Sequence, residues 1–466
     1  MSINEGNWGD LLSGKNAARS VALSGGVALH AINIYIATTV LPSVVKEING
    51  LELYAWNTTL FVVASILGAS LTAKTLRQAG SRKAYAIGIF FFFIGSLVCA
   101  LTPNMPIMLV GRSLQGFGGG FLFALSYSMI HRMFDETLWP RAMALVSGMW
   151  GIATLLGPAV GGIFAEMDAW RAAFFTLAPI TLAYTILIWR VLPAEDSVKN
   201  ETSKLPIPQL ILLAAAVLVI SASSVSTSIM WNMGGVLVAI LLLILMIRCE
   251  IVGKTRMLPK AALHISSSLF ALYATMGLLT IGMTSEIFVP YFLQTLHGQS
   301  PLLSGYIAAL MAFGWTAAEI LSSGWKAKGI RFAIVNGPIG VLIGLIILAV
   351  TMPLQGRGDS ILISFICIGL VLVGFGIGLG WPHLLTKVLQ VTAGEDQETA
   401  ASSITTVQLF AAALGSALAG MLVNLAGLNE GSIESTSNAA FWLFAIFSLS
   451  PIFALITAIR SARAHV

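Results

Sequence analysis

Charged side chains are scarce in this chain of 466 residues, where Lys, Arg, Asp and Glu together make up 10%. Soluble domains carry about a quarter of such residues. Apolar residues reach 57%, so the composition excludes an ordinary soluble enzyme and a disordered chain. It also excludes a nucleic-acid-binding protein, although the net charge is +5. The solvent that suits this composition is a lipid bilayer, in which a basic excess concerns orientation.

Cysteine is rare as well. The three cysteines, Cys99, Cys249 and Cys367, are odd in number and far apart, which excludes a disulfide framework and a cysteine-based metal site. The sequence has no HExxH motif, and its one imitation of a phosphate-binding loop, ending at Lys15, has Asn16 in place of Ser or Thr. We therefore expect no metal, no nucleotide and no other cofactor.

Long apolar runs, by contrast, are abundant. Fourteen stretches of about twenty residues, the length that one membrane crossing needs, lie between polar breaks. They predict an all-α integral membrane protein with spans at 20–45, 56–73, 84–101, 105–130, 142–165, 170–191, 208–228, 231–248, 264–293, 301–325, 332–352, 360–385, 398–426 and 437–459. Twelve spans stay open as an alternative, because removing a neighbouring pair would leave the alternation of the other loops unchanged.

Lysine and arginine follow the alternation of these predicted loops. Of the 25 such residues, only Lys46, Arg171 and Arg357 fall on the side opposite the N-terminus, and Arg112 lies inside a span. Cytoplasmic loops carry an excess of Lys and Arg. The distribution therefore predicts that both termini are cytoplasmic.

The first six and the last six predicted helices share short motifs in the same order. The matched pairs are Leu156–Gly162 with Leu414–Gly420, Gly116–Gly118 with Gly374–Gly376, and Gly80–Arg82 with Gly329–Arg331. This order predicts two six-helix halves in parallel orientation, with the helix pair between 208 and 248 outside the repeat. The predicted domains are a cytoplasmic N-terminus (1–19), an N-terminal bundle (20–192), a segment with two additional helices (193–263), a C-terminal bundle (264–460) and a tail (461–466).

Four motifs carry a resemblance to a known family. They are Arg112-x-x-Gln115-Gly116-x-Gly118 in the fourth helix, Gly157-Pro158-x-x-Gly161-Gly162 in the fifth, Trp170-Arg171-x-x-Phe174 opening the sixth, and Ser300-Pro301-Leu302-x-x-Gly305 before the tenth. With these motifs the chain resembles the major facilitator superfamily and, within it, the fourteen-helix drug:proton antiporters. The resemblance implies two six-helix bundles plus two linker helices, and proton-coupled export of lipophilic compounds, cationic ones included, by alternating access.

The same resemblance implies the setting of the protein. We expect a small-molecule substrate, a proton gradient as the energy source and a place in the inner (plasma) membrane of a bacterial cell. We expect no nucleic-acid partner, and a monomer in the bilayer.

Two departures from the family pattern favour alternative functions. Asn33 stands where the drug:proton antiporters often carry Asp in the first helix, and Arg77 replaces the acid of the loop between the second and third helices. These changes favour a metabolite exporter or an uncoupled facilitator of the same superfamily. An integral-membrane enzyme or a scaffold is a more distant alternative, since no catalytic cluster or large extramembrane segment is visible.

Ionisable side chains inside spans are the main candidates for function, because a charge in hydrocarbon must be paired or hydrated. Arg112 and Glu286 fall at similar depths, on helices that line the central cavity in this family. We hypothesise that Glu286 binds substrate and the coupling proton, with Arg112 as its counter-ion and Asn33 nearby. A permanent structural ion pair is the alternative.

Glu319 and His30 are further candidates within the spans. Glu319 is a second proton site or an inner gate contact, unless its side chain extends towards Lys326 or Lys328. His30 lies near the middle of the first helix and could titrate near neutral pH. A hydrogen-bonded histidine that packs between helices is the favoured alternative.

Glycine motifs and aromatic residues complete the candidate site. In the antiporter motif, Gly157, Pro158, Gly161 and Gly162 form a hinge and seal between the halves, or merely a close helix contact. In the inner loop, Gly80, Arg82 and Lys83 form a gate that docks on helix C-termini, unless positive-inside placement alone explains the two basic residues. The aromatic candidates for the cavity are Tyr35, Phe61, Tyr127, Tyr291 and Trp315, most of which also suit packing or lipid contact.

Overall fold

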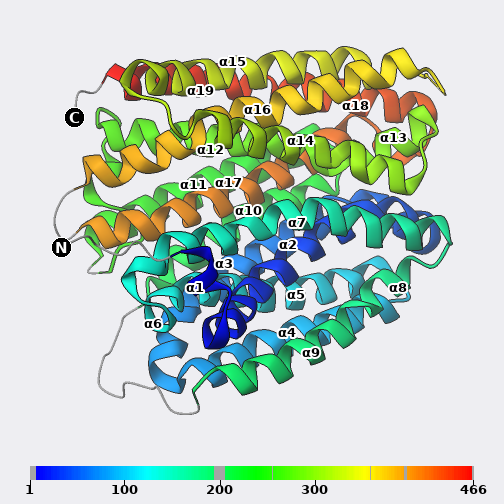
Figure 1. Ribbon diagram of the computed structural model, residues 1–466. Coiled ribbons are helices and arrows are strands. Elements are labelled where there is room, and N and C mark those ends of the chain that lie inside the picture. Colours follow the sequence, from blue (N-terminus) through cyan, green and yellow to red (C-terminus); the bar gives the residue numbers. More distant parts are fainter. Residues whose placement is uncertain (1–6, 194–204, 254, 357, 393–395, 464–466) are drawn as a thin grey trace. The chain divides into compact units, whose positions relative to one another are not determined.

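The computed structural model describes residues 7–193, 205–253, 255–356, 358–392 and 396–463. Within these residues all regular elements are helices, so the predicted all-α class is confirmed (Figure 1). Several basic residues used to orient the chain, namely Lys199, Lys204, Lys254 and Arg357, lie outside the described residues. So do the first six residues of the predicted N-terminal segment and the last three of the tail.

Thirteen helical stretches in the described residues are long and apolar enough to cross a membrane. They match thirteen of the fourteen predicted spans. The fourth predicted span corresponds to α5 (Met105–Ser128), which contains Arg112, Gln115 and five glycines and is therefore less apolar. Its 24 residues still give a length of about 36 Å, enough for a bilayer core.

Contacts divide the chain into two compact units. Unit 1 comprises Met1–Asn49 and Leu60–Leu205, and unit 2 comprises Gly50–Thr59 and Pro206–Val466. The additional helix pair belongs to unit 2, whereas the sequence places it in a segment of its own. The predicted domain boundaries themselves stay a prediction.

The long helices of unit 1 are α2 (Gly14–Ile48), α4 (Ser81–Leu101), α5, α7 (Trp139–Glu166) and most of α3 (Trp56–Ala79), followed by α8 (Trp170–Phe175) and α9 (Leu177–Val191). The short helices α1 (Trp8–Leu11) and α6 (Ile130–Met133) flank them. Helix α2 packs mainly on α7, and α4 on α5. Helix α9 begins after a break at Thr176, close to Pro179, whose ring removes a backbone donor.

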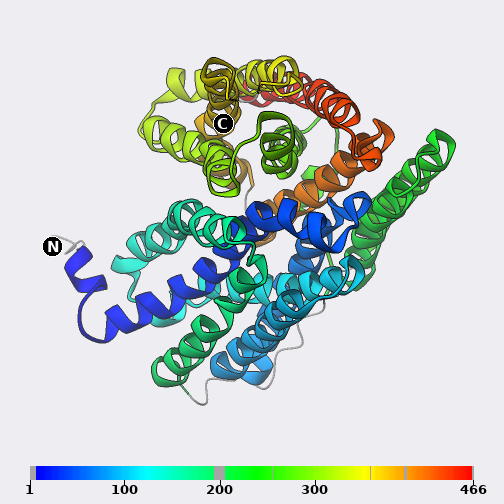
Figure 2. The ribbon, with the colours of Figure 1, turned by 90° about the vertical axis from the view of Figure 1, so that its right-hand side faces the viewer.

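Unit 2 contains more helices. They are α10 (Ile207–Ser224), α11 (Ile229–Val252), α12 (Ser268–Met283), α13 (Val289–His297), α14 (Pro301–Ser322), α15 (Ala327–Thr351), α16 (Ser360–Val391), α17 (Asp396–Leu425), α18 (Ile433–Phe447) and α19 (Leu449–Arg463). Helices α15 and α14 each pack along α16, and α10 packs on both α11 and α17. Figure 2 shows the same units turned by 90°.

The predicted ninth span is not one continuous helix. Helix α12 ends at Met283, the 3₁₀ segment η4 (Thr284–Phe288) follows, and α13 begins at Val289 with Pro290 in its first turn. A proline lacks the backbone donor that would continue the preceding helix. A short 3₁₀ stretch within a long helix is typical of a hinge. Glu286 therefore lies on a step between two helices.

Each unit contains the same glycine contacts, in the order that the sequence repeat predicts. A Cβ atom on Gly116 of α5 would overlap the carbonyl oxygen of Phe61 in α3. In unit 2, a Cβ atom on Gly374 of α16 would overlap the carbonyl oxygen of Met311 in α14. Only glycine permits such close approach of two helices. The repeat in sequence is thus a repeat in packing.

Candidate functional site

A buried polar network surrounds Arg112 in the middle of unit 1. The Arg112 side chain is 2% exposed, and its Nη1 donates to Gln115 Oε1 over 2.8 Å. Its guanidinium carbon lies 4.2 Å from the ring centre of Phe61, a cation–π arrangement. Gln115 Nε2 in turn donates to Ser96 Oγ on α4 over 3.0 Å. The charge of Arg112 is therefore stabilised inside unit 1 by Gln115 on its own helix and by the aromatic face of Phe61 on α3.

His30 of α2 lies beside this network in an aromatic enclosure. Its ring is stacked on Phe61 at 5.2 Å and lies 5.4 Å from Phe123 and 6.1 Å from Trp150, measured between ring centroids. It is 4% exposed, and its Nδ1 has no hydrogen-bond partner in the described part of the chain. The ring is thus packed among aromatic side chains, whereas no hydrogen bond reaches its Nδ1 from the described residues, and the role of His30 stays a prediction.

Asn33 lies one helical turn beyond His30. It is fully buried, and neither the oxygen nor the nitrogen of its amide has a hydrogen-bond partner among the described residues. An unpaired buried polar group costs about 1–3 kcal/mol. This position therefore favours a water molecule or another polar group from outside the chain, and its side chain is neutral where the family often has an acid.

Glu286 is the carboxylate of the η4 step in unit 2. Its neighbours along the chain, Ser285 and Phe288, are fully buried, and its own side chain is partly exposed. Within unit 2, no hydrogen bond or ion pair reaches the carboxylate from the residues that the structure describes. Arg112 belongs to unit 1, so its predicted pairing with Glu286 stays a prediction.

Glu319 is held by an aromatic residue on its own helix. Trp315 Nε1 donates to Glu319 Oε2 over 3.2 Å, a contact across one turn of α14. The Trp315 ring also meets Trp381 of α16, with centroids 4.8 Å apart and planes at 61°. The alternative in which Glu319 pairs with Lys326 or Lys328 is not observed among the described residues. Glu319 thus has one indole donor, and that indole packs on the buried Trp381.

The other aromatic candidates contact residues of their own unit, and their place in a cavity stays a prediction. Tyr127 and Ser147 share a hydrogen bond of 3.1 Å between their hydroxyl oxygens. Tyr291 contacts Tyr54 with ring centroids 5.6 Å apart. Tyr35 lies against α7, where a Cβ atom added to Gly157 would overlap the Cβ atom of Tyr35. Trp381 is a further aromatic of this group that the sequence did not single out, because its partner Trp315 lies on another helix.

The antiporter motif packs α7 on α2 within unit 1. Gly161 brings α7 close to Ile36 and Thr39, as Gly157 does at Tyr35, and Gly162 is buried too. Pro158 lies inside the helix and removes one backbone hydrogen bond. The close helix contact is thus observed, whereas the hinge and seal between the halves stay a prediction.

The comparison with protein families decides what kind of protein this is. The sequence profile of the Major Facilitator Superfamily matches residues 23–415. The chain belongs to this family. It is therefore a multi-pass membrane protein of a transporter superfamily, which confirms the fold and the general class that the sequence predicts.

Relatives and solved structures within the superfamily agree. A probable multidrug-efflux transporter of Mycobacterium tuberculosis is 34% identical over 459 residues, covering 96% of both chains. A multidrug efflux pump of Staphylococcus aureus is 25% identical over 383 residues, covering 80% of this chain and 82% of the other. A bacterial homologue of the human lysosomal transporter Spinster has the same fold, with a TM-score of 0.67, 12% identity and coverage of 96% and 97%.

The inner-loop motif of the superfamily is a single-residue turn here. Helix α3 ends at Ala79 and α4 begins at Ser81, so Gly80 alone makes the turn, with φ at 81°. Arg82 donates to the carbonyl oxygen of Leu192, just past α9, over 2.6 Å. Its charge complements that helix C-terminus, while Lys83 is exposed. Arg82 therefore docks within unit 1, and a gating role stays a prediction.

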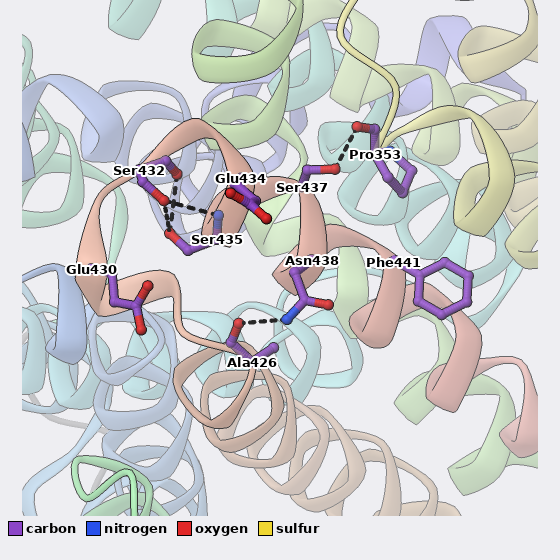
Figure 3. A pocket seen from close by; sticks show the side chains of 9 residues that line it. All are labelled: Pro353, Ala426, Glu430, Ser432, Glu434, Ser435, Ser437, Asn438 and Phe441. Atoms are coloured by element: carbon purple, nitrogen blue, oxygen red, sulfur yellow. Dashed lines mark hydrogen bonds between the residues drawn. The ribbon is translucent and has the colours of Figure 1, made fainter.

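A pocket of about 550 Å³ opens where α15 and α17 end (Figure 3). Its lining includes Glu430 and Glu434, whereas Asn438 and Ser437 already donate to the carbonyl oxygens of Ala426 and Pro353. No group of three His, Cys, Asp or Glu side chains that could hold a metal occurs in the part of the chain described. None of the residues that line this pocket belongs to the candidate functional site described above.

Proposed function

We propose that this protein exports lipophilic compounds, cationic ones included, in exchange for protons, by alternating access in the bacterial inner membrane with both termini in the cytoplasm. The energy source is the proton gradient, and no cofactor takes part. The named relatives support drug efflux, since the mycobacterial transporter covers 96% of this chain at 34% identity. The partners are a small molecule and the bilayer.

The observation that carries proton coupling is the position of Glu286. A carboxylate without a protein partner in unit 2 can exchange its proton when its surroundings change. It lies on a 3₁₀ step, where a change in the angle between α12 and α13 would move it. In contrast, Arg112 has its own partners and Asn33 does not titrate, so neither supplies the proton.

The observation that supports a cationic substrate is the group formed by Trp315, Glu319 and Trp381. Its carboxylate is held in place by an indole N–H, which leaves the second oxygen available to a ligand. The partly exposed Trp315 ring, which packs on the buried Trp381, provides apolar surface beside that charge. A planar organic cation satisfies both requirements.

An uncoupled facilitator is the second candidate, and the neutral Asn33 favours it. Purified protein in liposomes separates the two functions. Uptake of an ethidium-type cationic dye is measured with and without an imposed pH gradient. Antiport predicts accumulation against the dye gradient only when the pH gradient is present. Equal movement under both conditions would establish the facilitator, and no movement of any dye in a panel would refute drug export.

A further inference from the structure

The additional helix pair α10–α11 contains a buried carboxylate where α11 ends and α10 begins, and this carboxylate is not part of the candidate transport site. Glu250, in the last turn of α11, is 0% exposed. A buried carboxylate is costly unless hydrogen bonds replace its water. Glu250 Oε1 accepts from the backbone nitrogens of Met257 and Leu258 over 2.5 and 2.6 Å. The chain that leaves α11 is therefore folded back onto this side chain.

Gln209 joins the start of α10 to the same point. It is 2% exposed, and its Nε2 donates to Glu250 Oε2 over 3.2 Å and to the carbonyl oxygen of Thr255 over 2.9 Å. The first turn of α10, the last turn of α11 and the following segment thus form one hydrogen-bonded group. We call Gln209, Glu250, Thr255, Met257 and Leu258 the Glu250 clamp.

The other end of the pair is fastened to the bundle. Asn424 of α17 donates to the carbonyl oxygen of Ser224, the last residue of α10, over 3.0 Å. Helix α10 packs along α17, while α11 presents a largely exposed apolar face that suits lipid. The green pair in Figures 1 and 2 is thus held at both ends inside unit 2. It is a fixed part of that unit and not a loose linker.

The clamp lies just before α12, the helix that leads to the η4 step with Glu286. From Leu258 the chain enters the short segment η3 (Lys260–Leu263), which contacts both α11 and α12. Ser267 caps the start of α12, and Arg460 donates to the carbonyl oxygen of Ile265 over 2.9 Å. Helix α12 then leads directly into η4 and Glu286. A shift at the clamp would therefore move the start of α12 and, through the helix, the η4 step.

We propose that Glu250 is a positioning residue for transport: the Glu250 clamp makes the α10–α11 pair a strut that fixes the start of α12 and thereby the place of Glu286. This proposal rests on the proposed function of Glu286. It gives the additional pair a role that the two six-helix bundles do not supply for themselves.

The test uses full-length protein and two single substitutions that break the clamp from either side. In Glu250→Gln the new amide nitrogen faces the amide nitrogen of Gln209, so two donors meet. In Gln209→Leu the donor to Glu250 Oε2 and to the carbonyl oxygen of Thr255 is lost, while Glu250 keeps its contacts with the backbone of Met257 and Leu258. The matched control is Glu136→Gln, which alters an exposed acid in unit 1.

Dye turnover per folded molecule is the first measurement, with the folded amount taken from size-exclusion chromatography. We expect about a tenfold lower turnover in both Glu250→Gln and Gln209→Leu and no change in Glu136→Gln. A structural role alone would reduce the folded amount but leave turnover per molecule unchanged, and that result would overturn the proposal. Unchanged turnover in Gln209→Leu beside a loss in Glu250→Gln would overturn it as well, because the clamp would then not act as one group.

Amide hydrogen exchange is the second measurement and does not depend on transport. We expect Glu250→Gln to speed exchange in peptides covering 255–263 and also in those covering the η4 step. Faster exchange confined to 255–263 would overturn the positioning role even if transport is impaired. Faster exchange at η4 in a protein that transports no dye would instead support the strut and refute the proposed function.

Discussion

At the scale of single residues, the two units contain different ionisable groups at their centres. Arg112 is buried, donates a hydrogen bond to Gln115 and lies over the aromatic face of Phe61. Glu286 has no such partner among the described residues of its own unit, and Glu319 has one indole donor. A charge with permanent partners stabilises structure, whereas one with few partners can respond to a ligand or a proton. The acids of unit 2 are therefore the groups that we propose carry transport.

The contact between Trp315 and Glu319 leads to a prediction about selectivity. In Glu319→Gln the second side-chain oxygen is replaced by a neutral donor, so a cationic ligand loses a charge-assisted contact. We expect KM for a cationic dye to rise about tenfold, the equivalent of one such contact, while KM for a neutral dye stays the same. Transport kinetics in liposomes measure both. An equal change for the two dyes would argue against cation binding at Glu319.

The residues of the site differ in how far sequence could predict them. Arg112 and Glu286 stand out because charges are rare in spans, and the contact of Glu319 with Trp315 follows from a spacing of four on a helix. Trp381 and the Glu250 clamp could not be found in this way. Their partners lie on other helices or segments, 66 residues away for Trp315 and 41 for Gln209, and only the fold brings them together.

At the scale of helices, glycine sets how closely neighbours pack. Gly116 of unit 1 and Gly374 of unit 2 occupy equivalent positions, and each lies against backbone atoms of a neighbouring helix. Gly120 and Gly378 repeat these contacts one turn later. Sequence predicts these helices and their repeat. It does not predict the η4 step, because the apolar run continues across Pro290 and hides the break.

Alanine substitution tests these helix contacts. In Gly116→Ala and Gly374→Ala the new methyl group meets a carbonyl oxygen, so we expect a loss of about 1–3 kcal/mol of stability from overpacking. Gly148→Ala is the matched control, since nothing lies within 4 Å of the new atom. Thermal unfolding in detergent measures the three variants. A melting temperature of Gly116→Ala equal to that of Gly148→Ala would contradict the close packing.

At the scale of the whole molecule, composition alone predicts the bilayer, and the alternation of Lys and Arg predicts the direction of every loop. Both depend on residue type alone, namely on hydropathy and on the positions of Lys and Arg, and can therefore be read directly from the sequence. The grouping of α10 and α11 with unit 2 could not be read in the same way, because it depends on polar contacts such as Asn424 with Ser224. Family membership shows the transporter class, and the proposed coupling to protons rests on Glu286.

The most direct test of that central claim is transport by Glu286→Gln in liposomes with an imposed pH gradient. The substitution keeps the size of the side chain and removes its proton exchange. We expect downhill movement of dye to continue and accumulation driven by the pH gradient to disappear, while Glu319→Gln keeps its gradient dependence. Accumulation by Glu286→Gln at the wild-type level under the same gradient would contradict the assignment of Glu286 as the coupling acid.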